Sequence, residues 1–192
     1  MPMRYAAIRT MDVSNGAGLG ISLFTQGCRN HCPHCHNLDQ WTFDGGEEFT
    51  QESIDKIMDL CSAEWVKRFS VLGGEPLEPE NHQQLANLLT QVKKTYPDIS
   101  IWLYTGFVLE DVFSPDCRAN TPYVADILSN CDIVVDGPYS DAKKNIALRF
   151  AGSENQRVID MNKTRAARRV VLWEDDPLFN EHMNEQLGAL ER

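Results

Sequence analysis

Three cysteines stand close together, and their type and spacing make them the first candidates for chemistry. Cys28, Cys32 and Cys35 follow the pattern C-x3-C-x2-C. Thiolates gathered on one loop hold iron–sulfur clusters, and in a reducing compartment such a group indicates metal binding or catalysis before it indicates disulfides. A fully saturated cluster needs four protein ligands. With three local cysteines, one iron would stay open to another ligand.

A closed zinc site is the alternative for this loop, with His31, His34 or His36 as a fourth ligand. Such a site would stiffen the loop without catalysis. Zinc knuckles usually pair two cysteine-rich halves, and the sequence supplies no second half downstream. The spacing therefore favours the cluster. The remaining cysteines are scattered and are expected to pack in the core: Cys61, Cys117 and Cys131.

A second segment with chemical potential is LGGEPL at residues 72–77. Gly73 and Gly74 let the backbone approach a ligand closely. The Glu75 carboxylate beside them can accept charge-assisted hydrogen bonds from an ammonium group. The glycine-containing stretch 15–20 is rejected as a dinucleotide-binding loop, because its spacing is wrong and a strand follows it instead of a helix.

Alternating strands and helices must position these residues. Apolar periodicity predicts strands at 20–26, 69–72, 99–105 and 132–136, weaker strands at 158–161 and 169–173, and helices at 52–68, 79–96 and 122–130. This alternation indicates an α/β fold with a parallel sheet and outer helices.

The unusual residues all lie at or just after the ends of predicted strands. The cysteines follow the first strand and the GGE segment the second, while Thr105 ends the third and Asp136 the fourth. The carboxyl ends of parallel strands are where sites form in α/β folds. The sequence therefore predicts that these residues share one site, although Asp136 equally suits an ordinary Asp-Gly turn.

Length and charge restrict the remaining possibilities. The chain has 192 residues, enough for one domain, and a formal net charge of −10. An acidic surface repels phosphate backbones, so direct nucleic-acid binding is not expected. No apolar run is long enough to cross a bilayer, and the start lacks a signal peptide, so a cytoplasmic location is expected. His31 and His82 are expected on the surface.

The cysteine segment resembles the signature of the radical S-adenosylmethionine (SAM) superfamily, and residues 72–77 resemble its second motif. The residue before the last cysteine is usually aromatic or apolar there and is His34 here. The resemblance would put its ring against the SAM adenine. It also implies a single-domain partial, open β/α barrel of the radical SAM type, with parallel strands and outer helices.

Several further segments resemble the activases of anaerobic ribonucleotide reductase, within the activases of glycyl-radical enzymes. These are residues 15–18, 35–37 with Trp41, 101–107, 134–138 and 148–157. Gly20 departs from the pattern, because the family often carries an Arg there. We expect residues 1–161 to form the activase domain and 162–192 an extension. A strand and an acidic helix packed on the same domain are expected in it, either covering the open barrel edge or forming a partner surface.

The resemblance implies an oxidoreductase with a 4Fe–4S cluster and SAM as cofactors. SAM would bind the open iron through its amino and carboxylate groups, and one electron would break its sulfur–C5′ bond. The resulting 5′-deoxyadenosyl radical would take a hydrogen from a glycine of the reductase, leaving a glycyl radical. The implied partners are the glycyl-radical subunit of the reductase and an electron donor such as flavodoxin.

Residue roles also follow from the resemblance. The implied cluster ligands are Cys28, Cys32 and Cys35. The residues implied to lie closest to SAM around the open iron are His34, Cys35 and His36. Those implied to seat its methionine end are Gly73, Gly74 and Glu75. Weaker candidates, facing the same cavity from later strand ends, are Thr105, Asp136 and Asn155. No side chain is given a catalytic role, because the cluster and SAM carry the chemistry.

Three other functions stay open at this point. The same chemistry could act on another glycyl-radical enzyme, such as pyruvate formate-lyase. A zinc-stabilised binding module would perform no catalysis. A simple electron carrier would hold a cluster without cleaving SAM.

Overall fold

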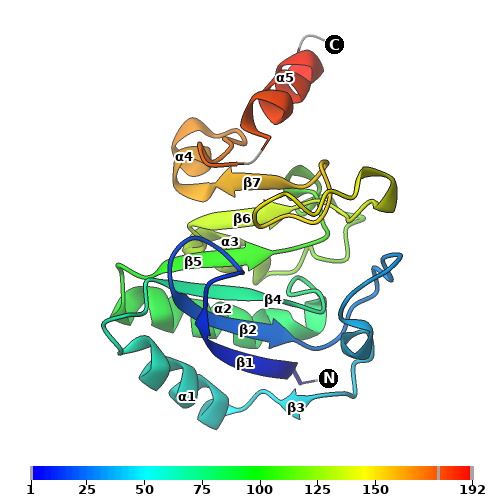
Figure 1. Cartoon of the computed structure of the whole chain (residues 1–192). Coiled ribbons are helices and arrows are strands. Elements are labelled where there is room, and N and C mark those ends of the chain that lie inside the picture. Colours follow the sequence, from blue (N-terminus) through cyan, green and yellow to red (C-terminus); the bar gives the residue numbers. More distant parts are fainter. Residues whose placement is uncertain (1, 177, 191–192) are drawn as a thin grey trace.

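The computed structural model describes residues 2–176 and 178–190 and contains one open seven-stranded sheet (Figure 1). Across the sheet the strands follow the order β3-β1-β2-β4-β5-β6-β7. Their bounds are β1 Arg4–Asp12, β2 Gly20–Thr25, β3 Glu47–Glu48, β4 Arg68–Gly73, β5 Ser100–Tyr104, β6 Ile133–Asp136 and β7 Arg157–Asp160. The central strands β2, β4, β5 and β6 are parallel, whereas β1, β3 and β7 pair antiparallel to their neighbours.

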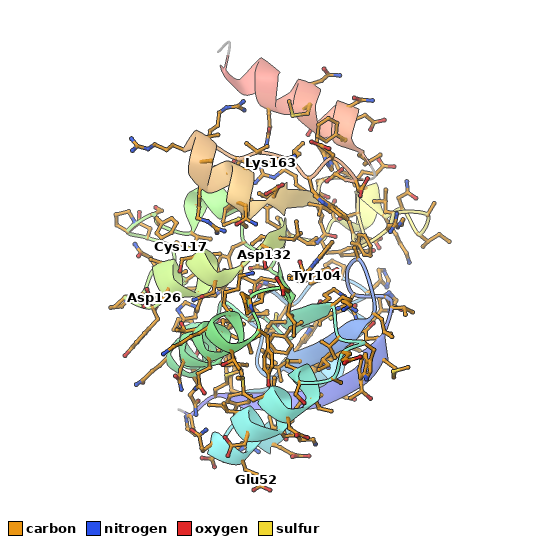
Figure 2. The ribbon with its side chains drawn as sticks, turned by 90° about the vertical axis from the view of Figure 1, so that its left-hand side faces the viewer. Glu52, Tyr104, Cys117, Asp126, Asp132 and Lys163 are labelled. Carbon is orange, nitrogen blue, oxygen red and sulfur yellow. The ribbon has the colours of Figure 1, made fainter. Side chains whose placement is uncertain are left out.

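Helices α1, α2 and α3 precede the parallel strands β4, β5 and β6 and cover one face of the sheet (Figure 2), whereas α4 and α5 follow β7. Their bounds are α1 Gln51–Cys61, α2 Pro79–Thr95, α3 Val124–Asn130, α4 Met161–Ala167 and α5 Phe179–Leu190. Short 3-10 helices occur at Leu38–Gln40, Leu109–Asp111 and Asp141–Lys143. Pro79 starts α2, where its missing N–H costs nothing and its fixed φ suits a helix. Within the described residues, no helix is long and apolar enough to span a membrane.

Strand alternation gives the sheet two different faces. In β4, Phe69 and Val71 point into the main apolar core beneath the helices, while Arg68 and Ser70 are buried on the other side. That second face carries a smaller apolar cluster built around Trp102, which Phe150 and Trp173 cover edge-on at ring-centroid distances of 5.1 and 5.2 Å. The central strands are therefore buried on both faces, whereas β1 and β3 at one edge carry exposed residues.

A buried arginine organises the end of the sheet opposite the cysteines. Arg68 lies across from Gly20 in the β2–β4 ladder and is fully buried. Its guanidinium donates to the carbonyl oxygens of Asp12 at 2.6 Å, Asn15 at 2.8 Å and Gly18 at 3.4 Å. A Cβ at Gly20 would lie 2.2 Å from the Arg68 carbonyl oxygen. No side chain, and so no Arg, fits at position 20. The guanidinium beside Gly20 belongs instead to Arg68 of the neighbouring strand β4.

The structure confirms the predicted α/β class and the four central strands, and the helices predicted at 79–96 and 122–130 lie within two residues of their predicted bounds. Three details were wrong. The sheet is not all parallel, because β1, β3 and β7 are antiparallel. The predicted strand at 169–173 is only an isolated bridge between Ile159 and Leu172. The predicted helix 52–68 ends at Cys61.

The segment beyond residue 161 also differs from the expectation. Instead of a strand, it begins with α4, whose N-cap Asp160 accepts a hydrogen bond from the backbone N–H of Lys163. The acidic helix is present as α5. Asp176 joins this segment to β7, because its Oδ2 accepts the Val158 N–H at 2.7 Å. His182 adds a contact through Nε2, 2.6 Å from the carbonyl oxygen of Glu154.

Candidate functional site

A cavity of about 270 Å³ opens where the parallel strands end. The cysteine-bearing loop after β2 and the loop after β6 reach this same end of the sheet, on the right in Figure 1. The cavity is lined by Cys28, Asn30, Cys32, His34, Cys35, His36, Asn37, Trp41, Leu72, Gly73, Gly74, Glu75, Tyr104, Thr105, Gly106, Val135, Gly137, Tyr139 and Gln156. Residues from the ends of β4, β5 and β6 thus meet the three cysteines.

The start of the cysteine loop is fixed by a glycine. Gly27 has φ +92°, and a Cβ there would lie 2.4 Å from the Phe43 ring. The backbone N–H groups of Gly27 and Cys28 donate to the carbonyl oxygens of Gln40 at 2.9 Å and Trp41 at 3.2 Å. The loop therefore closes on itself between residues 27 and 41. This closure holds Cys28 in a buried position at the cavity wall.

Of the six cysteines, only Cys28, Cys32 and Cys35 line the described cavity. Burial first, and the nearby carboxylates of Glu75 and Glu78 second, raise the pKa of the Cys28 thiol to about 11. Burial also raises the pKa of Cys32. Thiolates in such surroundings need a cation to compensate them, and bound iron supplies that charge. The donor set therefore fits a 4Fe–4S cluster with three protein ligands. Among the described residues, no three His, Cys, Asp or Glu side chains already surround a single-ion position.

Glu75 is a buried hydrogen-bond acceptor that joins three segments of the site. Oε1 accepts from the Leu77 N–H at 2.9 Å and the Thr105 hydroxyl at 2.7 Å. Oε2 accepts from the Asn30 side chain at 2.9 Å and the Gly106 N–H at 2.8 Å. Burial raises the pKa of Glu75 above its ordinary value, and these four hydrogen bonds offset only part of that rise. The carboxylate thus braces the cysteine loop against the ends of β4 and β5.

A second buried acid holds the outer side of the cysteine loop. Glu78 accepts from the Arg29 N–H at 2.9 Å and forms ion pairs with Arg29 at 2.5 Å and Arg118 at 3.1 Å. Arg29 also pairs with Glu80 at 2.5 Å. Because Glu78 is fully buried, its pairs are poorly screened by solvent. This network fixes the backbone directly after Cys28.

Most of the sequence-predicted site residues lie together. The cavity lining includes the three cysteines, His34, His36, Gly73, Gly74, Glu75 and Thr105. Gly73 has φ +110°, and a Cβ on Gly74 would lie 2.5 Å from the Gly27 carbonyl oxygen. Both glycines are therefore required for the strand end to approach the cysteine loop. The individual roles in holding a cluster or SAM stay predictions.

Asp136 and Asn155 lie elsewhere, outside the described lining. Asp136 is buried and accepts from the Leu109 N–H at 2.8 Å and from the Arg157 guanidinium at 2.9 Å. Asn155 donates to the Pro138 carbonyl oxygen at 2.7 Å. Both side chains instead brace the loop between β6 and β7. That loop brings Gly137, Tyr139 and Gln156 to the cavity.

Two histidines, His31 and His82, were both expected on the surface, but they differ in burial. His31 is exposed as predicted, with its ring stacked on Trp41 at 4.4 Å. His82 was expected on the surface, and this was wrong, because it is fully buried with Nδ1 2.6 Å from the Thr121 hydroxyl. The expectation for the scattered cysteines holds for Cys61 and Cys131, which are buried, whereas Cys117 is half-buried.

Sequence reasoning missed Asn30, Tyr104, Tyr139 and Gln156 as lining residues. Asn30 stands between two of the cysteines, and Tyr104 stands directly before Thr105. Adjacency to these predicted site residues was the available signal for both. Tyr139 and Gln156 depend on the fold of the loop after β6. Nothing local in the sequence marks Tyr139, and Gln156 lies within the resembling segment 148–157 but was not singled out there.

The sheet and its three-cysteine cavity define an α/β protein of the iron–sulfur class. Residues 14–159 match the family described as a 4Fe-4S single cluster domain. The chain is 31% identical to the anaerobic ribonucleoside-triphosphate reductase-activating protein of Enterobacteria phage T4, over 81% of this chain and 93% of that protein. It is 34% identical to the protein of the same name from Vibrio cholerae, over 80% of this chain and 96% of that protein. For the protein of that name from Escherichia coli K12, the identity is 31%, over 81% and 97%. The chain belongs to the family of anaerobic ribonucleoside-triphosphate reductase-activating proteins.

Proposed function

We propose that this chain is a radical SAM activase that generates a glycyl radical on anaerobic ribonucleotide reductase. The observation that carries the proposal is that three cysteines, and no others among the described residues, line a cavity beside Gly73 and Gly74. A cluster held there keeps one iron free of cysteine. Membership of the activating-protein family supports the choice of the reductase as the target.

Cys28, Cys32 and Cys35 would hold the 4Fe–4S cluster. When bound, the cluster supplies the electron that cleaves SAM into methionine and the 5′-deoxyadenosyl radical. The chain's own residues bind, orient and shield. Gly73 and Gly74 leave room for the methionine end of SAM, and His34 and His36 border it on the cysteine loop.

The loop after β6 would limit solvent entry, because Tyr139 borders the cavity and the neighbouring Asp141 lies 3.9 Å from His34 Nε2. We propose a cytoplasmic location and a flavodoxin-like protein as electron donor. These follow from the reducing chemistry that the cluster requires.

The test combines reduced, cluster-loaded protein with SAM and the reductase, followed by electron paramagnetic resonance. We expect the doublet of a glycyl radical on the reductase. With pyruvate formate-lyase in place of the reductase, we expect no such signal. A signal only with pyruvate formate-lyase would identify that enzyme as the target. If SAM were cleaved in the presence of neither enzyme, the activase function would be refuted.

Cysteine variants test the site itself. Cys32→Ala should lose cluster iron and SAM cleavage, because it removes one of three ligands. Cys117→Ala is the matched control, since Cys117 lies outside the described cavity lining, and it should keep both. One zinc per chain and no iron after anaerobic purification would refute the proposal in favour of a binding module. A cluster that is reduced without cleaving SAM would indicate an electron carrier.

A further inference from the structure

The proposed reaction requires a second protein at the cavity. The glycine that loses its hydrogen belongs to the reductase, so part of that protein must reach the opening that Cys32 and Tyr139 border. The cysteine loop and the loop after β6 both contribute to the lining and lie at the same end of the sheet, on the right in Figure 1. The exposed side chains of these two loops are therefore the first candidates for a docking surface.

The loop after β6 contains a short hairpin at residues 140–154, which we call the arm. Its two legs are joined by an antiparallel bridge between Lys144 and Ser153. The backbone N–H of Glu154 donates to the carbonyl oxygen of Lys143 at 2.9 Å. Hydrogen bonds of the backbone thus give the arm a defined conformation, so a partner would meet a preformed surface and would not have to order it.

The tip of the arm exposes an apolar side chain, because Ile146 is 91% exposed. The turn that carries it is fixed by Asn145, whose side chain accepts the Ala147 N–H at 3.0 Å and donates to Glu154 at 3.0 Å. A single exposed aliphatic residue is common on protein surfaces. This one stands on a fixed turn of the loop that borders the cavity, and a partner covering it would remove nearly the whole side chain from water.

The arm also concentrates positive charge around Ile146. Lys143, Lys144 and Arg149 are exposed, and within the described residues none of them forms an ion pair. Residues 142–153 contain no Asp or Glu, although the whole chain has a formal net charge of −10. Cations that are left unpaired on a fixed surface attract a partner of opposite charge and orient its approach.

We propose that the arm is the docking surface for the glycyl-radical subunit of the reductase, through a patch of that subunit in which carboxylates surround an apolar recess. The three cations of the arm pair with the carboxylates, and Ile146 fills the recess. This inference rests on the proposed function for the identity of the partner. The arm itself takes no part in holding the cluster or SAM.

The position of the arm favours the reductase over the electron donor as the partner. An electron can reach a cluster through intervening protein, so the donor need not approach the cavity opening. The glycine, in contrast, must enter the cavity. The arm belongs to the same loop as Tyr139, which lines the cavity, and docking on the arm would bring the reductase to that opening.

The test measures binding of the purified reductase subunit to the cluster-loaded protein. Lys143→Glu combined with Lys144→Glu should raise the dissociation constant about tenfold and remove most of its salt dependence, because two attractive charges become repulsive. The matched control combines Lys56→Glu with Lys94→Glu. It makes the same change of charge on two exposed lysines of α1 and α2 and should leave binding unchanged.

A second variant tests the apolar contact without changing any charge. Ile146→Ser should raise the dissociation constant about tenfold, because the partner then buries a smaller and polar side chain. Its matched control is Val13→Ser, since Val13 is 69% exposed and follows β1 at the end of the sheet opposite the cysteines. Neither residue lines the described cavity, so both variants should keep their iron and their affinity for SAM.

Activation kinetics give an independent measurement. The arm variants should need about tenfold more reductase for half-maximal formation of the glycyl radical, with the maximal rate unchanged, because docking is weakened and the cavity is intact. Wild-type protein that neither binds the reductase nor forms the radical would refute the proposed function. Wild-type activity with both measurements unchanged in the arm variants, or an equal loss in the controls, would refute this inference alone. Unchanged binding of the reductase with slower reduction of the cluster by flavodoxin would assign the arm to the electron donor and also refute it.

Discussion

Replacing Glu75 with glutamine tests whether this side chain is a brace within the protein or a contact for the ligand. The carboxylate accepts four hydrogen bonds from Leu77, Thr105, Asn30 and Gly106. In Glu75→Gln one oxygen becomes an NH2 group, which faces two donors instead of accepting from them. Two of the four hydrogen bonds are lost, and the remaining two lose their charge assistance.

The expected cost follows from those contacts. A hydrogen bond to a charged group contributes about 1.5–3 kcal/mol, so losing two costs about 3–6 kcal/mol. Two effects favour the lower end of that range. The Thr105 hydroxyl can turn to accept from the new amide, and the variant no longer buries a charge, which is what raises the pKa of Glu75. A loss of about 3 kcal/mol lowers the melting temperature of a chain of this size by about 6–12 °C.

The assay is thermal unfolding of the chain before iron loading, with circular dichroism as the signal that monitors it. Glu80→Gln is the matched control, because Glu80 makes only a surface pair with Arg29 and should change stability by less than about 1 kcal/mol. If Glu75→Gln melted with the wild type and lost only SAM binding after cluster loading, the brace would be refuted. The carboxylate would then be a direct ligand contact.

Two further predictions concern buried charges away from the cavity. Arg68→Met should lower stability by about 3–5 kcal/mol in denaturant unfolding, because it removes the donor of three carbonyl oxygens and the cationic partner of the buried Asp12 carboxylate. An unchanged midpoint would contradict this role. Burial lowers the pKa of His182, but its hydrogen bonds to Asp176 and the Glu154 carbonyl outweigh this and raise it. The contact of His182 with Asp176 and Glu154 should therefore be strongest below pH 6.5 and be lost as pH rises through the raised pKa. Limited proteolysis should then cleave α5 faster at high pH. His182→Gln should abolish that pH dependence.

The sequence predicted the central strands because each is a short apolar run that ends at a polar or glycine residue. β1 was missed because its sequence, RYAAIRTMD, mixes exposed and half-buried positions without clean alternation. It is a strand because β2 pairs with it, which is a long-range effect. The direction of β7 was also beyond local reasoning. Short-range patterns do not determine how the chain returns after β6.

At the site, local spacing was sufficient for the cysteines and the two glycines, since each group lies within one loop. Side-chain roles were harder, because hydrogen-bond partners come from far along the chain. Asp136 ends β6 and Thr105 directly follows β5, so both stand at strand ends. Arg157, 21 residues after Asp136, nevertheless draws the Asp136 carboxylate away from the cavity.

The cysteine loop and the GGE segment are two motifs in sequence but one physical unit in the fold. The Gly74 and Glu75 N–H groups donate to the carbonyl oxygens of Thr25 and Gly27 at 2.9 Å each. Glu75 then accepts from Asn30, which stands between two cysteines. A substitution in either segment must therefore disturb both the position of the thiols and the room left beside Gly74. Variants that separate cluster binding from SAM binding should therefore come from residues outside this unit.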